Sequence, residues 1–91
     1  MSMAERMRTK LEAAFSPQSL EVIDESEQHR GHGGWREGGE THFRIRMTAA
    51  AFDGLSRVER HRAVNRAVAQ ELEEGVHALA LDLSGTGTAT A

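Results

Sequence analysis

The sequence predicts one two-layer α+β domain, with helices on one face of a small sheet. Three observations predict it: an amphipathic helical stretch at the amino end, two stretches of alternating apolar and polar residues, and a second helical stretch between them. A chain of 91 residues forms one domain with a modest core, so a large internal substrate pocket is not expected. We expect the domain to occupy residues 1–84.

The first helix is expected to begin after Ser2. Ser2 and Glu5 match a capping box, in which each side chain accepts a hydrogen bond from the other residue's backbone amide. Apolar residues then recur at helical spacing over residues 3–15. Pro17 ends the helix, because the residue before a proline avoids the α region.

Two strands are expected to follow and to pair as an antiparallel hairpin. Residues 20–23 include β-branched residues, which favour a strand. Residues 42–48 alternate, with apolar side chains at Phe43, Ile45 and Met47 and polar ones on the opposite, wet face. The polar side chains are those of His42, Arg44 and Arg46. Residues 27–40, rich in glycine, predict a long loop, and such loops often carry function.

The second half of the sequence predicts a short connector, a long helix and a third strand. Residues 49–55 form the connector, anchored by Phe52. Ser56 and Glu59 match a second capping box, and one helix is expected over residues 57–74. Alternation resumes over residues 76–83, with His77 starting the strand in phase with its leucines. Residues 85–91 are small and predict a flexible carboxy-terminal tail.

Composition excludes several classes of function. The formal charge of −3 provides no global basic field for nucleic acid. The chain has no cysteine, which excludes disulfides, thiol chemistry and a metal site built from its own thiolates. The sequence contains no nucleophile elbow, phosphate-binding loop or paired-carboxylate signature, which are the motifs that would indicate an enzyme. The charged amino end lacks a signal sequence and no apolar run reaches membrane-spanning length, so a cytoplasmic protein without a membrane partner is expected.

Histidines are the first candidate site residues. His29 and His32 lie among glycines, which let a backbone fold close to an ion. His77 follows the end of the long predicted helix. Imidazole binds zinc, copper, nickel and iron. Taken alone, these residues also fit a solvated loop and a half-buried histidine, because the sequence supplies no other ligands. Our hypothesis is an incomplete metal site that a partner completes.

Arginines of the long predicted helix are the second candidate group. Arg57 and Arg60 are three residues apart, and Arg62 and Arg66 are four apart, so each pair shares a patch of helix surface. Such arginines suit a phosphate-binding or acid-binding ridge, although a solvated helix face would have the same composition. The arginines near the helix start oppose the helix dipole, which is unfavourable without a function.

Five blocks of the sequence resemble the BolA-like proteins in order and spacing, from about residue 3 to residue 83. The blocks are residues 20–26, 39–43, 52–56, 60–65 and 76–79. The resemblance implies an α-β-β-α-α-β domain with a three-stranded mixed sheet, similar to the type II KH topology. It does not imply RNA binding, because residues 57–66 lack the glycine-x-x-glycine clamp of a KH domain.

The resemblance also implies a function. BolA-like proteins partner monothiol glutaredoxins, and the pair can bridge a [2Fe–2S] cluster whose sulfur ligands come from the glutaredoxin cysteine and glutathione. His77 matches the family's carboxy-terminal histidine ligand; His29 is the favoured loop ligand and His32 the close alternative. A non-enzymatic adaptor in iron–sulfur and iron homeostasis is therefore expected. The isolated chain, a monomer or weak homodimer, is expected to carry no cluster.

A second function follows from the same resemblance, because the family includes members regarded as DNA-binding transcriptional regulators. The residues that would contact DNA are Arg57, Arg60, Arg62 and Arg66. A net charge of −3 predicts weak affinity for DNA.

Overall fold

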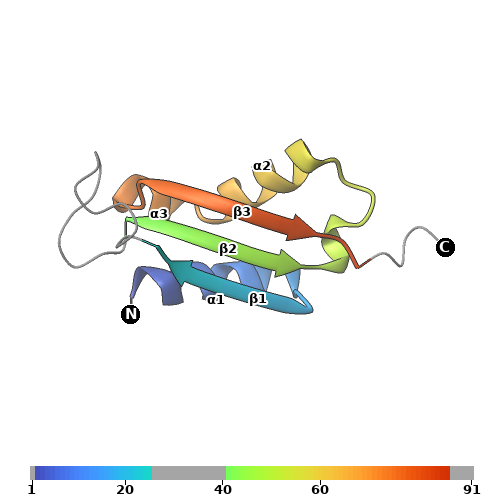
Figure 1. Ribbon diagram of the computed structural model, residues 1–91, viewed down its shortest axis with the longest axis horizontal. Helices are drawn as coiled ribbons and strands as arrows, with labels where there is room; N and C mark the ends of the chain where they lie inside the picture. Colours follow the sequence, from blue (N-terminus) through green and yellow to red (C-terminus); the bar gives the residue numbers. More distant parts are fainter. Residues whose placement is uncertain (1, 26–40, 87–91) are drawn as a thin grey trace.

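The computed structural model describes residues 2–25 and 41–86, which form a two-layer α+β domain (Figure 1). Three strands build one mixed sheet in the order β1-β2-β3. β1 (Ser19–Asp24) pairs antiparallel with β2 (His42–Thr48), and β2 pairs parallel with β3 (Ala78–Ser84). β2 is therefore the central strand, and the predicted fold class is confirmed.

The helices lie on one face of this sheet (Figure 1). They are α1 (Met3–Phe15), α2 (Arg57–Ala67) and α3 (Ala69–Glu74). The 3₁₀ turn η2 (Ala50–Phe52) follows β2 at the end of the sheet (Figure 1). Both predicted capping boxes are present. The Glu5 amide donates to Ser2 Oγ at 3.1 Å, and the Glu59 amide donates to Ser56 Oγ at 3.1 Å.

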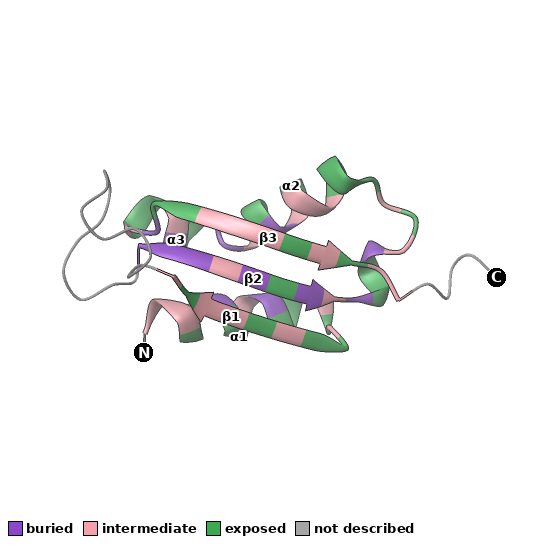
Figure 2. Cartoon of the chain, viewed as in Figure 1, coloured by how far each residue is buried: buried purple, intermediate pink, exposed green. Residues whose placement is uncertain are grey.

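The core lies between β2 and the helices, and β2 is the most deeply buried strand (Figure 2). Phe43, Ile45 and Met47 alternate along β2 and are all buried, as their spacing predicted. The rings of Phe15 and Phe52 pack 5.1 Å apart between their centroids. The rest of the buried apolar core is Met7, Leu11, Ala49, Val64, Val68 and Val76.

The single helix predicted over residues 57–74 is wrong, because the helix breaks at Val68. Val68 has φ −112° and ψ 23°, outside the helical region, and it separates α2 from α3. The Val68 side chain is fully buried, and a β-branched residue has low helix propensity. Packing of Val68 into the core therefore outweighs the continuity of the helix, which its sequence pattern could not show.

β3 begins later than the sequence predicted, at Ala78 in place of residue 76. The amides of Gly75 and Val76 both donate to the Glu71 carbonyl, so Val76 is still tied to the end of α3. Val76 is also buried in the core. His77 therefore lies in the connection between α3 and β3, immediately before the strand.

The carboxyl end of β3 is held by Asp53. The Thr86 amide and Thr86 Oγ1 each donate to the Asp53 carboxylate at 2.7 Å. A side chain at Gly85 would collide with the same carboxylate, so any larger residue there would displace the Asp53 side chain. Residues 85 and 86, which open the predicted tail, are thus packed on the domain, and residues 87–91 lie outside the described part of the chain.

A buried carboxylate joins α1 to α3. The Glu71 side chain is fully buried and forms ion pairs with Arg6 at 3.0 Å and Lys10 at 2.8 Å. Burial raises the pKa of the Glu71 carboxyl, but hydrogen bonding to Lys10 and the charges of Lys10 and Arg6 outweigh burial and lower it. Glu71 is therefore charged at neutral pH and stabilises the packing of the two helices.

Candidate functional site

His77 lies at the end of the sheet where β1 ends and β2 and β3 begin, which we call the histidine end. The amides of His77 and Ala78 both donate to the Thr41 carbonyl, at 2.7 Å and 3.1 Å. These bonds fix the backbone of His77, while its side chain is exposed. An exposed imidazole on a fixed backbone can act as a ligand to an ion that approaches from outside.

His42 lies beside His77 and was not identified from the sequence. The two rings are 5.5 Å apart between their centroids and inclined by 52°. His42 is only 6% exposed, so the prediction that its side chain lies on a solvent-exposed face of the strand is wrong. Its Nδ1 atom lies 2.9 Å from Thr41 Oγ1, and its carbonyl accepts from the Glu25 amide. Burial follows from these neighbours on both sides, which alternation along a single strand cannot reveal.

The predicted loop ligands His29 and His32 lie outside the described residues. The segment that carries them starts after Glu25 and ends before Thr41. Glu25 donates its amide to His42, and Thr41 accepts from His77, so both ends of the segment are anchored at the histidine end. The segment therefore begins and finishes at the histidine end.

The described residues fit part of a metal site and not a complete one. Residues 2–25 and 41–86 contain no group of three or more histidine, cysteine, aspartate or glutamate side chains that could hold a metal ion. The sequence contains no cysteine. An iron–sulfur cluster needs thiolates as well as any histidine ligands. His77 can therefore supply one ligand to a centre whose sulfur comes from another molecule.

The outer face of the sheet carries arginines that are already paired. Arg44 binds Glu25 at 2.9 Å and Asp82 at 3.2 Å, and Arg46 lies 3.5 Å from Asp82. Hydrogen bonds to Glu25 and Asp82, together with their charges, raise the pKa of Arg44. These carboxylates neutralise the positive charge of the two arginines, and binding of a nucleic-acid phosphate backbone to this face would depend on that charge.

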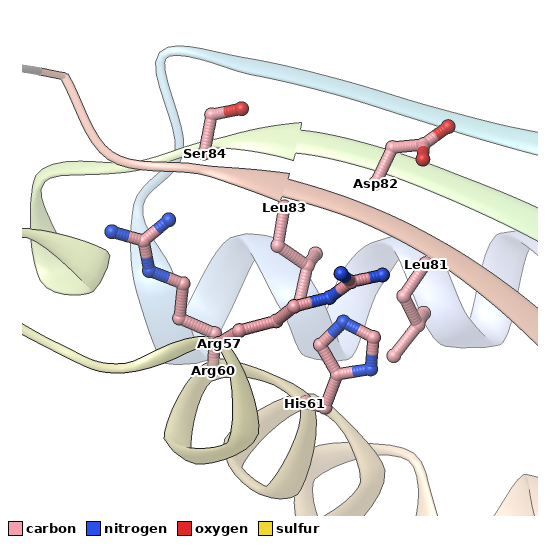
Figure 3. Close-up of a pocket in the computed structure, with 7 residues that line it drawn as sticks. All are labelled: Arg57, Arg60, His61, Leu81, Asp82, Leu83 and Ser84. Atoms are coloured by element: carbon pink, nitrogen blue, oxygen red, sulfur yellow. The ribbon is translucent and has the colours of Figure 1, made fainter.

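The helix arginines separate into the two pairs that their spacing predicted. Arg57 and Arg60 line a hollow against β3 (Figure 3). The strand residues of this hollow, 81–84, form the end of β3 that is remote from His77. Arg62 and Arg66 line another hollow that also contains Glu59. Hydrogen bonds from Ser56 and the charge of Arg62 lower the pKa of Glu59. Glu59 is therefore a negatively charged carboxylate that lies beside Arg62 and Arg66. The four arginines therefore do not form one continuous ridge.

No helix in residues 2–25 and 41–86 is long and apolar enough to cross a membrane.

Comparisons with known proteins match this fold and this sequence to one family. A family model described as BolA-like protein matches residues 11–87. A Sinorhizobium protein named "Uncharacterized protein in cobS 5'region" is 48% identical over 91 residues, covering 99% of this chain and 98% of that protein. The "DNA-binding transcriptional regulator BolA" of Escherichia coli K12 is 42% identical over 81 residues, covering 89% of this chain and 73% of that protein.

A solved structure agrees with these matches. The BolA domain of SufE1 from Arabidopsis thaliana has a TM-score of 0.84 and 42% identity, over 94% of each chain. Two Arabidopsis relatives are longer proteins, of which the chain spans 22% and 50%, and their names place them in chloroplasts or mitochondria. The matched family model describes no enzyme.

Proposed function

Since the chain belongs to the BolA-like protein family, we propose that it is a non-enzymatic adaptor that binds a monothiol glutaredoxin and shares a [2Fe–2S] cluster with it. Its role would be in iron–sulfur and iron homeostasis. One observation carries the proposal: His77 is exposed on a fixed backbone, at the end of the sheet where the histidine-bearing segment starts and finishes. The absence of cysteine requires that the thiolates come from the partner.

The residues of this chain have distinct parts in the proposed site. His77 supplies an imidazole ligand, and the buried ring of His42 beside it limits the positions that the His77 ring can adopt. A cluster with histidine in place of a thiolate has a higher reduction potential, and its ligation is sensitive to protonation of the imidazole. The glutaredoxin cysteine and glutathione would supply the remaining ligands.

We propose His29 as the loop ligand, with His32 as the alternative. His29 is the fourth residue after Glu25, and His32 is the seventh. An extended chain covers at most about 3.5 Å per residue, so covalent length permits either histidine to reach His77. Single substitutions can separate the two, because only the ligand should alter the spectrum of the cluster.

The experiment is anaerobic co-purification with a monothiol glutaredoxin and glutathione, followed by visible absorption and circular dichroism. We expect His77→Ala to remove the spectrum of the mixed complex and leave that of the glutaredoxin alone. Glu73→Ala, an exposed substitution on α3, is the control and should leave the spectrum unchanged. A His77→Ala complex with the wild-type spectrum would contradict the proposal. His29→Ala and His32→Ala identify the loop ligand.

DNA binding is a second proposal, favoured by the name of the E. coli relative. Arg57, Arg62 and Arg66 are exposed, whereas Arg60 is half-buried and donates Nε to the Phe52 carbonyl at 3.2 Å. Phosphate contacts of this kind produce an affinity that falls steeply with salt. A salt titration of binding to duplex DNA tests this, and a flat salt dependence or no binding would contradict it.

We also propose a cytoplasmic location and a monomer or weak homodimer for the chain alone. The names of the two Arabidopsis relatives assign those proteins to chloroplasts or mitochondria. Cell fractionation therefore tests the location of this chain. Sedimentation at several concentrations tests the oligomeric state.

A further inference from the structure

A cavity of about 310 Å³ lies between the start of α2 and the second half of β3 (Figure 3). Its lining combines cationic side chains from the helix with leucines from the strand. The lining residues are Arg57, Arg60, His61, Leu81, Asp82, Leu83 and Ser84. This volume is at the lower end of the range for small-molecule pockets and is larger than a bare phosphate ion requires.

The cavity is cationic inside. Arg57 and His61 extend from α2 toward β3, and Leu81 and Leu83 extend toward them, whereas the Arg60 guanidinium points the other way, toward the end of the strand (Figure 3). The Asp82 side chain points away on the other side of the strand (Figure 3), where its carboxylate is 3.2 Å from Arg44 and 3.5 Å from Arg46. Asp82 therefore does not neutralise the cavity, although its backbone forms part of the wall.

The two arginines are held differently. Arg60 donates Nε to the Phe52 carbonyl at 3.2 Å, which fixes the direction of its guanidinium. Arg60 Nη2 and the Asp53 carboxylate approach Gly85 from the same side, both within 3.5 Å of the position that a Cβ would take there. Asp53 therefore offsets part of the Arg60 charge. Arg57 is exposed, and no carboxylate in the described part of the chain forms an ion pair with it. Arg57 is thus available to an external anion.

The placement of these cations is unfavourable for the helix itself. Arg57 and Arg60 occupy the first turn of α2, where the helix dipole is positive and opposes a positive side chain. An anion in the cavity would relieve this effect.

We propose that this cavity binds the phosphate group of a small phosphomonoester. A phosphomonoester is a dianion near neutral pH, and guanidinium groups bind phosphate oxygens through two parallel hydrogen bonds. Arg57 would bind the phosphate, His61 beside it can donate a further hydrogen bond, and Leu81 and Leu83 would contact the organic part of the ligand (Figure 3). Arg60, whose guanidinium is held toward the Phe52 carbonyl, adds positive charge at the edge of the cavity.

The cavity is separate from the proposed cluster site. His77 precedes β3, whereas Leu83 is near its other end, six residues later. At about 3.3 Å per strand residue the two positions are roughly 20 Å apart. Failure of either the phosphate proposal or the glutaredoxin proposal therefore leaves the other unaffected.

The test is an NMR titration of the isolated protein with inorganic phosphate and with adenosine monophosphate, at constant ionic strength kept by sodium chloride. We expect shifts in the amides of residues 81–84 and in the Nε signals of Arg57 and Arg60. Arg57→Gln should weaken binding about tenfold, which is what one lost charge-assisted hydrogen bond predicts. Arg8→Gln removes the same charge from an exposed position on α1 and should leave binding unchanged.

Three results would overturn the inference. One is the absence of shifts at these residues with either anion at millimolar concentration. The second is equal weakening by Arg57→Gln and Arg8→Gln, which would mean that net charge alone attracts the anion. The third is a response of these residues to duplex DNA but not to adenosine monophosphate, which would assign the cavity to a phosphodiester backbone.

Discussion

The two ends of the sheet expose polar groups in opposite ways. At the histidine end, His77 is fixed through its backbone and its imidazole carries no hydrogen bond within the described residues. At the other end, which we call the arginine end, Arg60 is oriented by a hydrogen bond and the strand end is held by Asp53. A ligand to a shared metal must stay accessible to a partner, whereas a pocket for a small anion gains from groups that are oriented in advance. The difference predicts that substitutions at the two ends have separate consequences.

Phe52→Ala should have the largest effect and tests how far the arginine end depends on packing. Phe52 is fully buried, packs on Phe15, and presents the carbonyl that orients Arg60. Removing a buried phenylalanine side chain costs about 3–5 kcal/mol of unfolding free energy. Urea denaturation measures this loss, and a loss below about 1 kcal/mol would show that the core at this end is not packed as described.

Glu71→Gln should have the next largest effect, and it tests the packing beneath the histidine end. The substitution removes the ion pairs with Arg6 and Lys10, and a loss of about 2 kcal/mol is expected because both cations are partly exposed. The folded-state pKa of Glu71 is lowered, so its stabilisation is complete above the unfolded value near 4.5 and is lost as pH falls through the folded value.

Urea unfolding at several pH values checks the Glu71 prediction. The difference between wild type and Glu71→Gln should be constant from neutral pH down to about pH 5 and should shrink below that. Glu73→Gln, an exposed neighbour on α3, is the matched control and should show little difference. A wild-type advantage that grows in acid would contradict the direction of the pKa shift.

Gly85→Ala should have a smaller effect, confined to the arginine end. The new Cβ collides with the Asp53 carboxylate, so the hydrogen bonds from Thr86 to Asp53 must lengthen or break. A loss of about 1–2 kcal/mol is expected. Hydrogen exchange at the Thr86 amide should accelerate while exchange at the His77 amide is unchanged, and faster exchange at both would mean that the two ends are coupled.

His77→Ala should have the smallest effect on stability. Its side chain is exposed, and surface substitutions of this kind usually change the unfolding free energy by less than about 0.5 kcal/mol. Thermal unfolding should therefore match the wild type. A large loss would show that His77 supports the fold, and that loss of the cluster in this variant could not be assigned to ligation.

Local patterns accounted for most of the fold. Both capping boxes and the alternation of Phe43, Ile45 and Met47 are local signals, and the helix starts and the buried strand face followed from them. The break at Val68 was missed because it depends on packing against other elements. The parallel register of β2 and β3 is likewise a pairing between distant residues, which periodicity does not encode.

The candidate site was less accessible from the sequence. The pairing of Arg57 with Arg60, and of Arg62 with Arg66, followed from helical spacing. The position of β3, which closes the cavity around Arg57, did not follow from the sequence, because Leu81 and Leu83 are more than twenty residues from Arg57 along the chain. The burial of His42 beside His77 also required the position of β3 next to β2. His29 and His32 lie outside the described residues, and their role rests on the family.

The most direct test of the shared-cluster account labels one chain at a time. We would prepare the complex with ¹⁵N in this chain alone and unlabelled glutaredoxin, reduce the cluster, and record the nitrogen hyperfine couplings by pulsed electron paramagnetic resonance. The account predicts strong couplings to ¹⁵N from histidine of this chain, with the His77 contribution missing in His77→Ala. A cluster with no strongly coupled ¹⁵N would contradict it, because every ligand would then come from the partner and glutathione.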